Sequence, residues 1–580
     1  MTPQEHILQL HRESIEVNKY SVTTAHNLNR DIENQFKGQR KFFYELLQNA
    51  DDAGAGEIEF ILVGDVLIVR HTGRQFTSTD VAKICEYGQQ EHRDKITNMQ
   101  QTGYKGVGFK AIFSICSAAQ IISGGYSFLF DRDHAQWKAA PKDKPYPWQM
   151  IPIWTEGMPL GKDLEKYCDR NKVIFMFKIT NVLSLQQDLA AIQNEPDILL
   201  FLRHTSIMRI NHNHVIQKIS NGSIVDLNIN EDLFQKWQVQ NKTYLIDEKI
   251  KSVLQEMGDY ECPEKLKKAG TFQLEFAGLL ENDAPIASKG RLYNFLPTQV
   301  FAGLPFHVNA DFLPTTDRTQ LQDKAWNHYL IQWIGHLAFE WLQNVSQQHI
   351  AFRPHILQWL PLRTVNNLSE KMQHSYQQGF ESGSTSYRFI PSVNGLLTTL
   401  ARCMVDESGL RHDFLNFSYA EKDVAAKELL GTENLTDTTR FTFAFLIESL
   451  DSIALHLIAE NKKLILFLLH DGRSSHYKAK HDEKHLPHRK FVLTNQAILD
   501  APAKTYFPPQ NFTIPTGINI PIIHPSLLQG PEAGQIQAWL ESLGTQKCDA
   551  ISVFEGHVLQ LIEKNEINQK ILLRYYDLFF

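Results

Sequence analysis

The sequence predicts an α+β protein with three parts: an N-terminal α/β sandwich domain over residues 1–215, a second α/β domain over 216–343 and a mostly helical region over 344–580. Three observations support this prediction. The chain has 580 residues, more than one hydrophobic core normally organises. Helix and strand patterns alternate up to about Val215, and longer strand patterns follow up to about Glu340. Beyond about Asn344 helical patterns predominate, and no internal repeat is present.

The composition is that of a folded protein without a membrane span. Hydrophobic residues make up 43% and charged residues 21% of the chain, close to the average for globular domains. The longest strongly apolar run, Leu464 to Leu469, is far shorter than the roughly 20 residues that cross a bilayer. The N-terminus lacks the features of a secretory signal, and the six cysteines form no CxxC pair. We therefore expect a cytoplasmic protein with no membrane partner.

The first chemical element is a helix predicted over residues 40–53, RKFFYELLQNADDA, which Gly54 and Gly56 end. At 100° per residue, Glu45, Asn49 and Asp52 share one side of this helix, beside an apolar side. Two carboxylates and an amide facing a common space suit a magnesium nucleotide site, because Mg²⁺ prefers oxygen ligands and an attacking water needs orienting. The alternative is a solvated helix face.

A β-hairpin is predicted next, from EIEFILVGD and DVLIVRH joined by a Gly-Asp turn. It leads into HTGRQFT, with His71 and Gly73. The segment TGYKGVGFKAIFSI then places Gly103, Gly106 and Gly108 before an apolar helix. Glycines allow close backbone approach, and a helix N-terminus offers N–H groups to phosphates.

This glycine segment matches neither the P-loop pattern nor GxGxxG. Lys105 and Lys110 are candidates to neutralise phosphate charge as point cations. The alternative is a purely structural turn.

The order of these segments resembles the N, G1 and G2 boxes of the GHKL ATPases (gyrase, heat-shock chaperone, histidine kinase, MutL), whose fold is the Bergerat α/β sandwich. ELLQNADDA, HTGRQFT and GYKGVGFKAIF are similar to sacsin-like and heat-shock-chaperone-type members. The resemblance implies ATP and Mg²⁺ as ligands. By it, Glu45 is the catalytic glutamate that polarises water, Asn49 the magnesium ligand and Asp52 part of the base pocket. It also places Gly73 beside the purine, and Gly103, Gly106 and Gly108 in the phosphate loop.

A later segment, LYNFLPTQVFAGLPFHVNADFLPTTDRTQL, resembles the part that follows the ATPase domain in sacsin-like proteins. It is also similar to the chaperone middle-domain region that delivers an arginine to the nucleotide. The resemblance makes Arg318 the candidate for a catalytic arginine that stabilises charge on the terminal phosphate. The alternative is a surface ion pair.

Two positions depart from the family pattern. His71 stands where the G1 aspartate normally contacts adenine, and Gln75 replaces the second G1 glycine. A neutral imidazole accepts a hydrogen bond through one nitrogen, but it selects adenine less well than a carboxylate does.

Two functions follow from these sequence features. The first is Mg-dependent ATP hydrolysis coupled to conformational change, in a chaperone-like protein or in a multi-protein system such as anti-phage defence. The alternative is a non-hydrolysing scaffold with a degenerate nucleotide site. Either one implies a protein client or partner subunit and leaves a homodimer open. The net charge of -7 leaves nucleic acid as a partner only through a local basic surface or another protein.

In the histidine-rich stretch over residues 470–490, the helical spacing of His481, His485 and His488 could place three imidazoles together for zinc. Its mixed charges favour a solvated loop.

Overall fold

The computed structural model describes residues 1–16, 41–86, 108–138, 146–258, 270–315 and 318–406. In the C-terminal part it describes 422–436, 438–441, 447, 450–452, 458–470, 485–510, 514, 519–564, 569–570, 572–573 and 576. The chain divides into two compact units, Met1–Ser384 and Thr385–Phe580. Both predicted α/β domains fall within the first unit, and the boundary between them at residue 215 stays a prediction.

The first unit is built on one mixed sheet of 15 strands among the described residues. The order is β14-β13-β15-β11-β10-β9-β8-β7-β1-β2-β6-β3-β4-β5, and β12 pairs with β11. The strands are β1 (Glu57–Val63), β2 (Val66–His71), β3 (Cys116–Ser123), β4 (Tyr126–Asp131), β5 (Ile153–Trp154), β6 (Val173–Ile179), β7 (Ile207–Ile210), β8 (His214–Asn221), β9 (Ile224–Ile229), β10 (Asp232–Leu245), β11 (Thr271–Glu281), β12 (Ala284–Pro285), β13 (Leu292–Asn294), β14 (Leu296–Pro297) and β15 (His307–Ala310).

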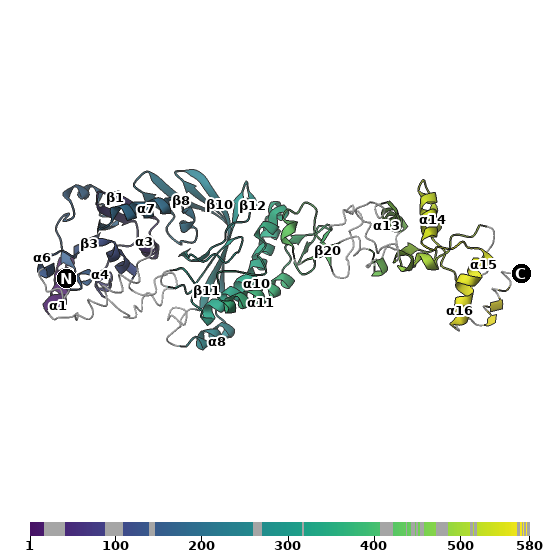
Figure 1. Ribbon diagram of the computed structural model, residues 1–580. Coiled ribbons are helices and arrows are strands. Elements are labelled where there is room, and N and C mark those ends of the chain that lie inside the picture. Colours follow the sequence, from purple (N-terminus) through teal and green to yellow (C-terminus); the bar gives the residue numbers. More distant parts are fainter. Residues whose placement is uncertain are drawn as a thin grey trace. The chain divides into compact units, whose positions relative to one another are not determined.

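Helices flank this sheet (Figure 1). The α-helices are α1 (Pro3–Glu16), α3 (Lys41–Asp52), α4 (Ser78–Ile84), α6 (Ala135–Lys138), α7 (Val182–Gln193), α8 (Glu248–Glu256), α10 (Ala325–Gln348) and α11 (Glu370–Ser386). The 3-10 helices are η1 (Gly108–Ser114), η2 (Trp148–Met150), η3 (Lys162–Tyr167), η4 (Pro196–Leu199) and η5 (Ile350–Trp359). The fold of this unit is therefore mixed α and β, as the sequence predicts.

The predicted helix and hairpin at the start of the chemical segment are confirmed. Helix α3 is followed by Gly54 in the left-handed region (φ +74°), where glycine ends helices without strain. Strands β1 and β2 pair antiparallel from Ile58↔His71 to Val63↔Val66, and Gly64 takes φ +60° in the turn. These elements bring the end of β2 next to the end of α3.

The sheet passes residue 215 without interruption. Strand β1 pairs parallel with β7, β7 pairs antiparallel with β8, and the ladder continues through β9 and β10 to β11 and β15. Strand β1 follows α3 in the chain, and β15 precedes the loop that contains Arg318. The backbone hydrogen bonds of the sheet therefore connect the α3 region with the Arg318 loop.

The core of the first unit is rich in aromatic residues. Phe43 of α3 meets Phe60 of β1 edge to face, with ring centroids 5.2 Å apart. Farther along the sheet, Trp341 of α10 donates from Nε1 to Gln238 Oε1 at 2.7 Å. Helices α10 and α11 lie side by side, because Gly379 leaves room for the carbonyl of Gln332. This packing fixes α10 on the sheet face.

One predicted helix takes a different form. The apolar segment after the glycine loop forms the 3-10 helix η1 in place of an α-helix. The helix η1 has only seven residues, Gly108 to Ser114, and strand β3 begins at Cys116. Such short connecting turns commonly take the tighter 3-10 form.

The second unit combines helices with short strands. Its α-helices are α13 (Ile458–His470), α14 (Ala533–Ser542), α15 (Ala550–Val553) and α16 (Leu559–Glu563), with the π-helical turn η13 (Phe554–Val558) and the 3-10 turns η7 (Thr432–Asn434), η8 (Leu450–Ser452), η10 (Leu486–His488), η11 (Pro502–Lys504) and η12 (Pro525–Leu528). Its strands are β16 (Ile390–Pro391), β17 (Leu397–Thr398), β18 (Cys403–Asp406), β19 (Asp423–Val424), β20 (Thr439–Phe441), β21 (Val492–Leu493) and β22 (Leu499–Asp500). A separate core forms around Ile465, Val492 and Leu540.

Candidate functional site

Helix α3 separates its apolar and polar residues as its sequence predicts. Phe42, Phe43, Leu46, Leu47 and Ala50 are buried in the core. The predicted site residues Glu45, Asn49 and Asp52 are each partly exposed. Three oxygen-bearing side chains therefore occupy the accessible side of one helix, where they can reach a ligand.

The neighbouring acid Asp51 has a different environment. Its side chain is buried and accepts three backbone N–H bonds, from Arg203 at 3.1 Å, His204 at 2.7 Å and Thr205 at 2.8 Å. A carboxylate that accepts several backbone donors is a strong anchor. Asp51 therefore fixes the C-terminal end of α3 to the loop that leads into β7.

The His71–Gly73 turn lies against that same end of α3. A Cβ on Gly73 would come within 2.9 Å of Ala53 Cβ and of His71 Nδ1, so only glycine fits there. The Arg74 N–H donates to the Ala53 carbonyl at 2.8 Å. The structure thus brings Gly73 and the C-terminal end of α3 together.

His71 is buried and acts as an acceptor. The Gly73 N–H donates to its Nδ1 at 3.1 Å. Burial lowers the pKa of His71 to about 4. The imidazole is therefore neutral at pH 7 and carries its proton on Nε2. Nδ1 is already used within the turn.

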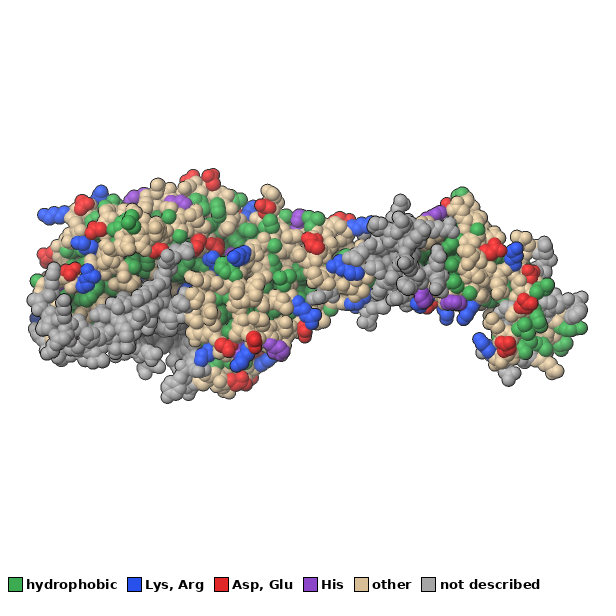
Figure 2. All heavy atoms as spheres, in the orientation of Figure 1, with side chains coloured by type: hydrophobic (Ala, Val, Ile, Leu, Met, Phe, Trp, Pro, Cys, Tyr) green, Lys and Arg blue, Asp and Glu red, His purple; other side chains and the backbone are tan. Residues whose placement is uncertain are grey.

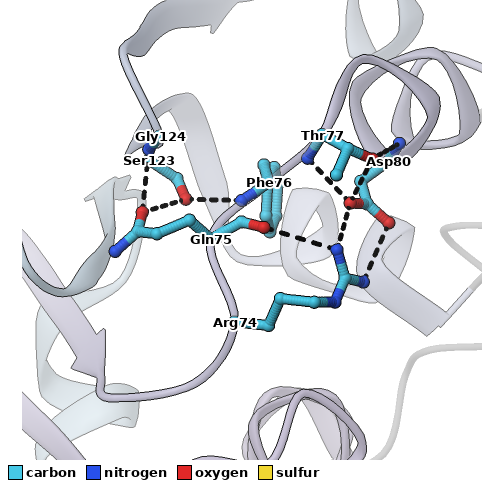
Figure 3. Close-up of polar contacts among 7 residues, drawn as sticks. All are labelled: Arg74, Gln75, Phe76, Thr77, Asp80, Ser123 and Gly124. Atoms are coloured by element: carbon cyan, nitrogen blue, oxygen red, sulfur yellow. Dashed lines mark hydrogen bonds and ion pairs between the residues drawn. The ribbon is translucent and has the colours of Figure 1, made fainter.

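Gln75 is tied to the hairpin between β3 and β4 (Figure 3). Its Oε1 accepts the Ser123 hydroxyl at 2.6 Å and the Gly124 N–H at 2.8 Å. Ser123 Oγ in turn accepts the Phe76 N–H at 2.9 Å. The residue that replaces the second family glycine therefore holds the G1 segment to the sheet.

Arg74 and Asp80 form the other half of this network (Figure 3). The guanidinium donates to both carboxylate oxygens, at 2.7 and 3.2 Å. Asp80 also completes a capping box with Thr77, the N-cap of α4. Burial raises the pKa of Asp80, but hydrogen bonds from Arg74 and Thr77 outweigh it and lower the pKa to about 2. Helix α4 thus begins at a well-fixed position after the turn.

Part of the predicted phosphate loop lies outside the described residues, namely Gly103, Lys105 and Gly106. Gly108 begins η1, which packs against α3. The structure therefore places the end of the loop beside the helix that carries Glu45.

Lys110 of η1 points into the protein. Its Nζ donates to the carbonyls of Ile84 and Gln149, each at 2.6 Å, and lies 5.3 Å from the centroid of the Phe130 ring. The side chain is buried, and burial lowers its pKa to about 8. A phosphate contact would require the ammonium to leave both carbonyls.

Arg318, which follows strand β15 in the chain, contacts helix α3. Its guanidinium donates to Gln48 Oε1 at 3.2 Å and to the Leu296 carbonyl at 3.3 Å. Its backbone takes a left-handed φ of +57°. Burial lowers its pKa, and the negative charge of Glu45 opposes this shift. The two predicted catalytic residues therefore interact electrostatically.

Sequence reasoning missed Gln48 and Asp51. Gln48 lies about 40° from Asp52 on the helical wheel, so the same wheel contained its position. The sequence does not predict which of the adjacent acids Asp51 and Asp52 is buried. Burial of Asp51 depends on the backbone N–H groups of residues 203–205, which are distant in sequence.

No protein-family model matches the chain. Part of the chain is similar to Sacsin. It is 30% identical to Sacsin from Homo sapiens over 126 residues, which is 19% of this chain and 3% of that protein. It is also 24% identical to Protein NO VEIN from Arabidopsis thaliana over 317 residues, which is 50% of this chain and 11% of that protein.

The chain thus spans a small part of both relatives' lengths. The similarity to Sacsin agrees with the resemblance of the three sequence segments to sacsin-like proteins.

Among the described residues, no helix has the length and apolar character needed to cross a membrane. The described residues also include no group of three or more His, Cys, Asp or Glu side chains placed to hold a metal. His476 and His481 of the histidine-rich stretch lie outside the described residues.

Proposed function

We propose that the first unit binds ATP with Mg²⁺ beside α3 and hydrolyses it, as a GHKL-type ATPase of the sacsin-like kind. The observation that carries this proposal is the contact of Arg318 with α3, the helix of Glu45 and Asn49. The resemblance implies an acidic helix, a glycine turn beside it and, as in the chaperone-type members, an arginine from a later segment. The contacts of α3 with Gly73 and Arg318 support the proposal.

Each residue has one role in this proposal. Glu45 orients or deprotonates the attacking water, and Asn49 supplies an oxygen ligand to Mg²⁺. Asp52 lines the base pocket beside the Gly73 turn. Gly103, Lys105, Gly106 and Gly108 surround the phosphates by resemblance alone. We assign no phosphate contact to Lys110, because its ammonium already donates to two carbonyls.

Arg318 changes partners in the proposed reaction. In the structure its guanidinium donates to the neutral amide of Gln48. An anionic phosphate oxygen attracts the guanidinium by its charge and can accept two of its N–H groups, so it competes well with the neutral Gln48 amide for the same donor. Arg318 then stabilises the negative charge that develops during transfer.

Hydrolysis would be coupled to a change of conformation through the Arg318 segment. This segment follows β15, which belongs to the same sheet as β1. A shift of Arg318 between Gln48 and phosphate therefore acts on α3 and the second half of the sheet together. We propose chaperone-like work on a protein client or within a multi-protein system as the setting.

A second candidate function is a scaffold that holds nucleotide poorly or does not hydrolyse it. The observation in its favour is that both altered G1 residues accept hydrogen bonds from other groups of the protein. His71 Nδ1 accepts the Gly73 N–H, and Gln75 Oε1 accepts two donors of the β3–β4 turn. Neither atom is then available to select a purine.

The deciding experiment is a calorimetric titration of the full chain with a non-hydrolysable ATP analogue, with and without Mg²⁺. Asn49→Ala is titrated beside it, with the exposed Asn213→Ala as matched control. The ATPase proposal expects magnesium-dependent binding that Asn49→Ala loses and Asn213→Ala keeps. Absence of binding in the unmodified protein would instead favour the scaffold.

A further inference from the structure

The second unit contains one structural module twice. We call residues 388–470 the first module and residues 490–576 the second module. The first module begins with the hairpin β16–β17, and the second begins with the hairpin β21–β22. The register of the first hairpin recurs 102 positions later in the second, in the pairs Ile390↔Thr398 and Val492↔Asp500. The two hairpins are therefore equivalent.

The contacts beyond each hairpin match as well. In the first module the Ala425 N–H donates to the Met404 carbonyl at 2.8 Å, and in the second the Ile523 N–H donates to the Tyr506 carbonyl at 2.9 Å. Met404 and Tyr506 each also pair in parallel with a later segment of their own module. Hairpin and following strands thus have the same arrangement in both modules.

The segments that follow these strands have similar sequences. Residues 447–461, IESLDSIALHLIAEN, match residues 551–565, ISVFEGHVLQLIEKN, with an isoleucine first, an asparagine last and three further identical residues. The sequence alone predicts no internal repeat, and this prediction is wrong for the second unit. The spacing between equivalent residues ranges from 98 to 104 positions, so the repeat has no fixed period.

Helix α13 of the first module binds the hairpin of the second. It contacts β21, η12 and α14. Asn461 of α13 is fully buried, and its Nδ2 donates to the Phe491 carbonyl at 2.7 Å. Its Oδ1 accepts the Leu493 N–H at 3.2 Å. The helical end of one module therefore holds the first strand of the next module through its backbone.

Equivalent apolar residues of the two modules differ in exposure. Three identical residues stand 104 positions apart, in the pairs Ile447 and Ile551, Leu468 and Leu572, and Leu469 and Leu573. Those of the first module are between 1% and 3% exposed, in the core that also contains Phe491 and Val492 of the second module. Those of the second module are between 41% and 68% exposed. Figure 2 shows hydrophobic side chains on the surface of this C-terminal part.

We propose that the exposed face of the second module, defined by Ile551, Leu572 and Leu573, binds a β-hairpin of the β21–β22 kind on a partner protein. The kind of partner is inferred from the repeat, because the equivalent face of the first module holds such a hairpin. A module of a repeat array buries part of its apolar surface only against its neighbour. The partner strand is apolar, as Phe491 to Leu493 are.

A second copy of this chain fits the face less well than another protein does. Its hairpin β21–β22 is already held by α13. In its hairpin β16–β17, Phe389 and Ile390 are fully buried. Either hairpin would have to leave these contacts before it could bind another copy. The proposed occupant is therefore a hairpin of a different protein.

The test titrates a hairpin peptide into the full chain and follows its fluorescence anisotropy. The peptide has the sequence of residues 489–501, RKFVLTNQAILDA, closed by a disulfide between added terminal cysteines. We expect saturable binding, and binding about tenfold weaker or less when serine replaces Phe491, Val492 and Leu493 in the peptide. No binding of the first peptide, or equal binding of both, would overturn the proposal.

Two variants locate the site. Leu573→Glu and Ile551→Glu should each weaken peptide binding by about tenfold or more, because a carboxylate on the apolar face loses its hydration when the hairpin binds. Leu430→Glu, at a leucine of the first module that is 52% exposed, is the matched control. Equal peptide affinity in all these proteins would overturn the location. Sedimentation of the full chain without peptide tests the other occupant. Self-association that Leu573→Glu abolishes would assign the face to a second copy and overturn the partner hairpin.

Discussion

The Arg318 guanidinium lies 3.2 Å from Gln48 Oε1, although 270 residues separate the two in sequence. This hydrogen bond joins the loop after β15 to α3. Gln48 is one turn from Glu45 and adjacent to Asn49. A change at Arg318 therefore alters a direct contact of the helix that carries Glu45 and Asn49.

Replacing Arg318 with lysine should slow ATP turnover by about 100-fold or more and leave analogue binding largely intact. Lysine keeps the charge but lacks the planar fork of N–H donors with which an arginine pairs with phosphate oxygens. Steady-state phosphate release measures the effect. Turnover equal to that of the unmodified protein would remove Arg318 from the catalytic groups.

Replacing Gln48 with glutamate should also slow turnover, for a different reason. A carboxylate at this position would form a charge-assisted pair with Arg318 and hold it away from phosphate. We expect a higher midpoint of thermal unfolding together with lower kcat. A faster enzyme would show that Arg318 does not have to leave residue 48.

Replacing Glu45 with alanine should abolish turnover and preserve magnesium-dependent binding. General base and water-orienting groups typically contribute about 100- to 10,000-fold. Phosphate release and calorimetry on the same sample separate the two effects. The exposed Glu256→Ala serves as control, and equal turnover in Glu45→Ala and Glu256→Ala would contradict the assignment.

The adjacent acids of α3 should respond in opposite ways. Asp51→Asn loses the anion that accepts three backbone N–H groups, so the free energy of unfolding should fall by about 3 kcal/mol. Asp52→Asn should cost less stability and weaken nucleotide binding more. Urea unfolding and calorimetry of the two variants test this, and the reverse pattern would show that their roles are exchanged.

Replacing Lys110 with methionine should destabilise the fold without weakening ATP binding. The carbonyls of Ile84 and Gln149 would lose their donor, at a cost of about 2 to 4 kcal/mol. The exposed Lys178→Met is the control. A stable variant with a large loss of ATP affinity would instead assign Lys110 to the phosphates.

His71 predicts a specific pH dependence of stability. Its pKa is lowered to about 4 in the folded protein, from 6.5, so the unfolded chain binds the proton more readily. The associated stability is complete above pH 6.5 and is lost as pH falls toward 4. Between pH 7 and 5 the loss is about 2 kcal/mol at 1.36 kcal/mol per pKa unit.

Urea unfolding at pH 7 and pH 5 tests this prediction. His71→Gln should lose about 2 kcal/mol less over this range than the unmodified protein does. The exposed His204→Gln should behave as the unmodified protein. Parallel pH profiles for all three proteins would mean that folding does not lower the pKa of His71.

Much of the local structure could be predicted from the sequence, because its signals are local. The amphipathic helical pattern of residues 40–53 predicted α3, and the Gly-Asp turn at Gly64 predicted the β1–β2 hairpin. The inward direction of Lys110 could not be predicted, because it depends on carbonyls at Ile84 and Gln149 that distant segments provide.

In the candidate site, too, the features set by local sequence could be predicted and the contacts between distant segments could not. The partly exposed positions of Glu45, Asn49 and Asp52 agree with a helical wheel. The contact between Arg318 and Gln48 depends on the sheet order from β1 to β15, which no local pattern contains. The backbone N–H groups that donate to His71 and Gln75 could not be predicted either. Both residues differ from the family pattern, and the sequence does not show which contacts they make instead.

The uninterrupted sheet determines where this protein can be cut. A fragment that ends at residue 215 would remove most of β8 and strip β7 of its antiparallel partner. Strand β7 would then become an exposed edge strand, whose unpaired N–H and C=O groups could pair with a second molecule. Such a fragment should self-associate, whereas one that ends near residue 384 retains the complete sheet. Gene fusions and natural recombination should accordingly respect the second boundary and avoid the first.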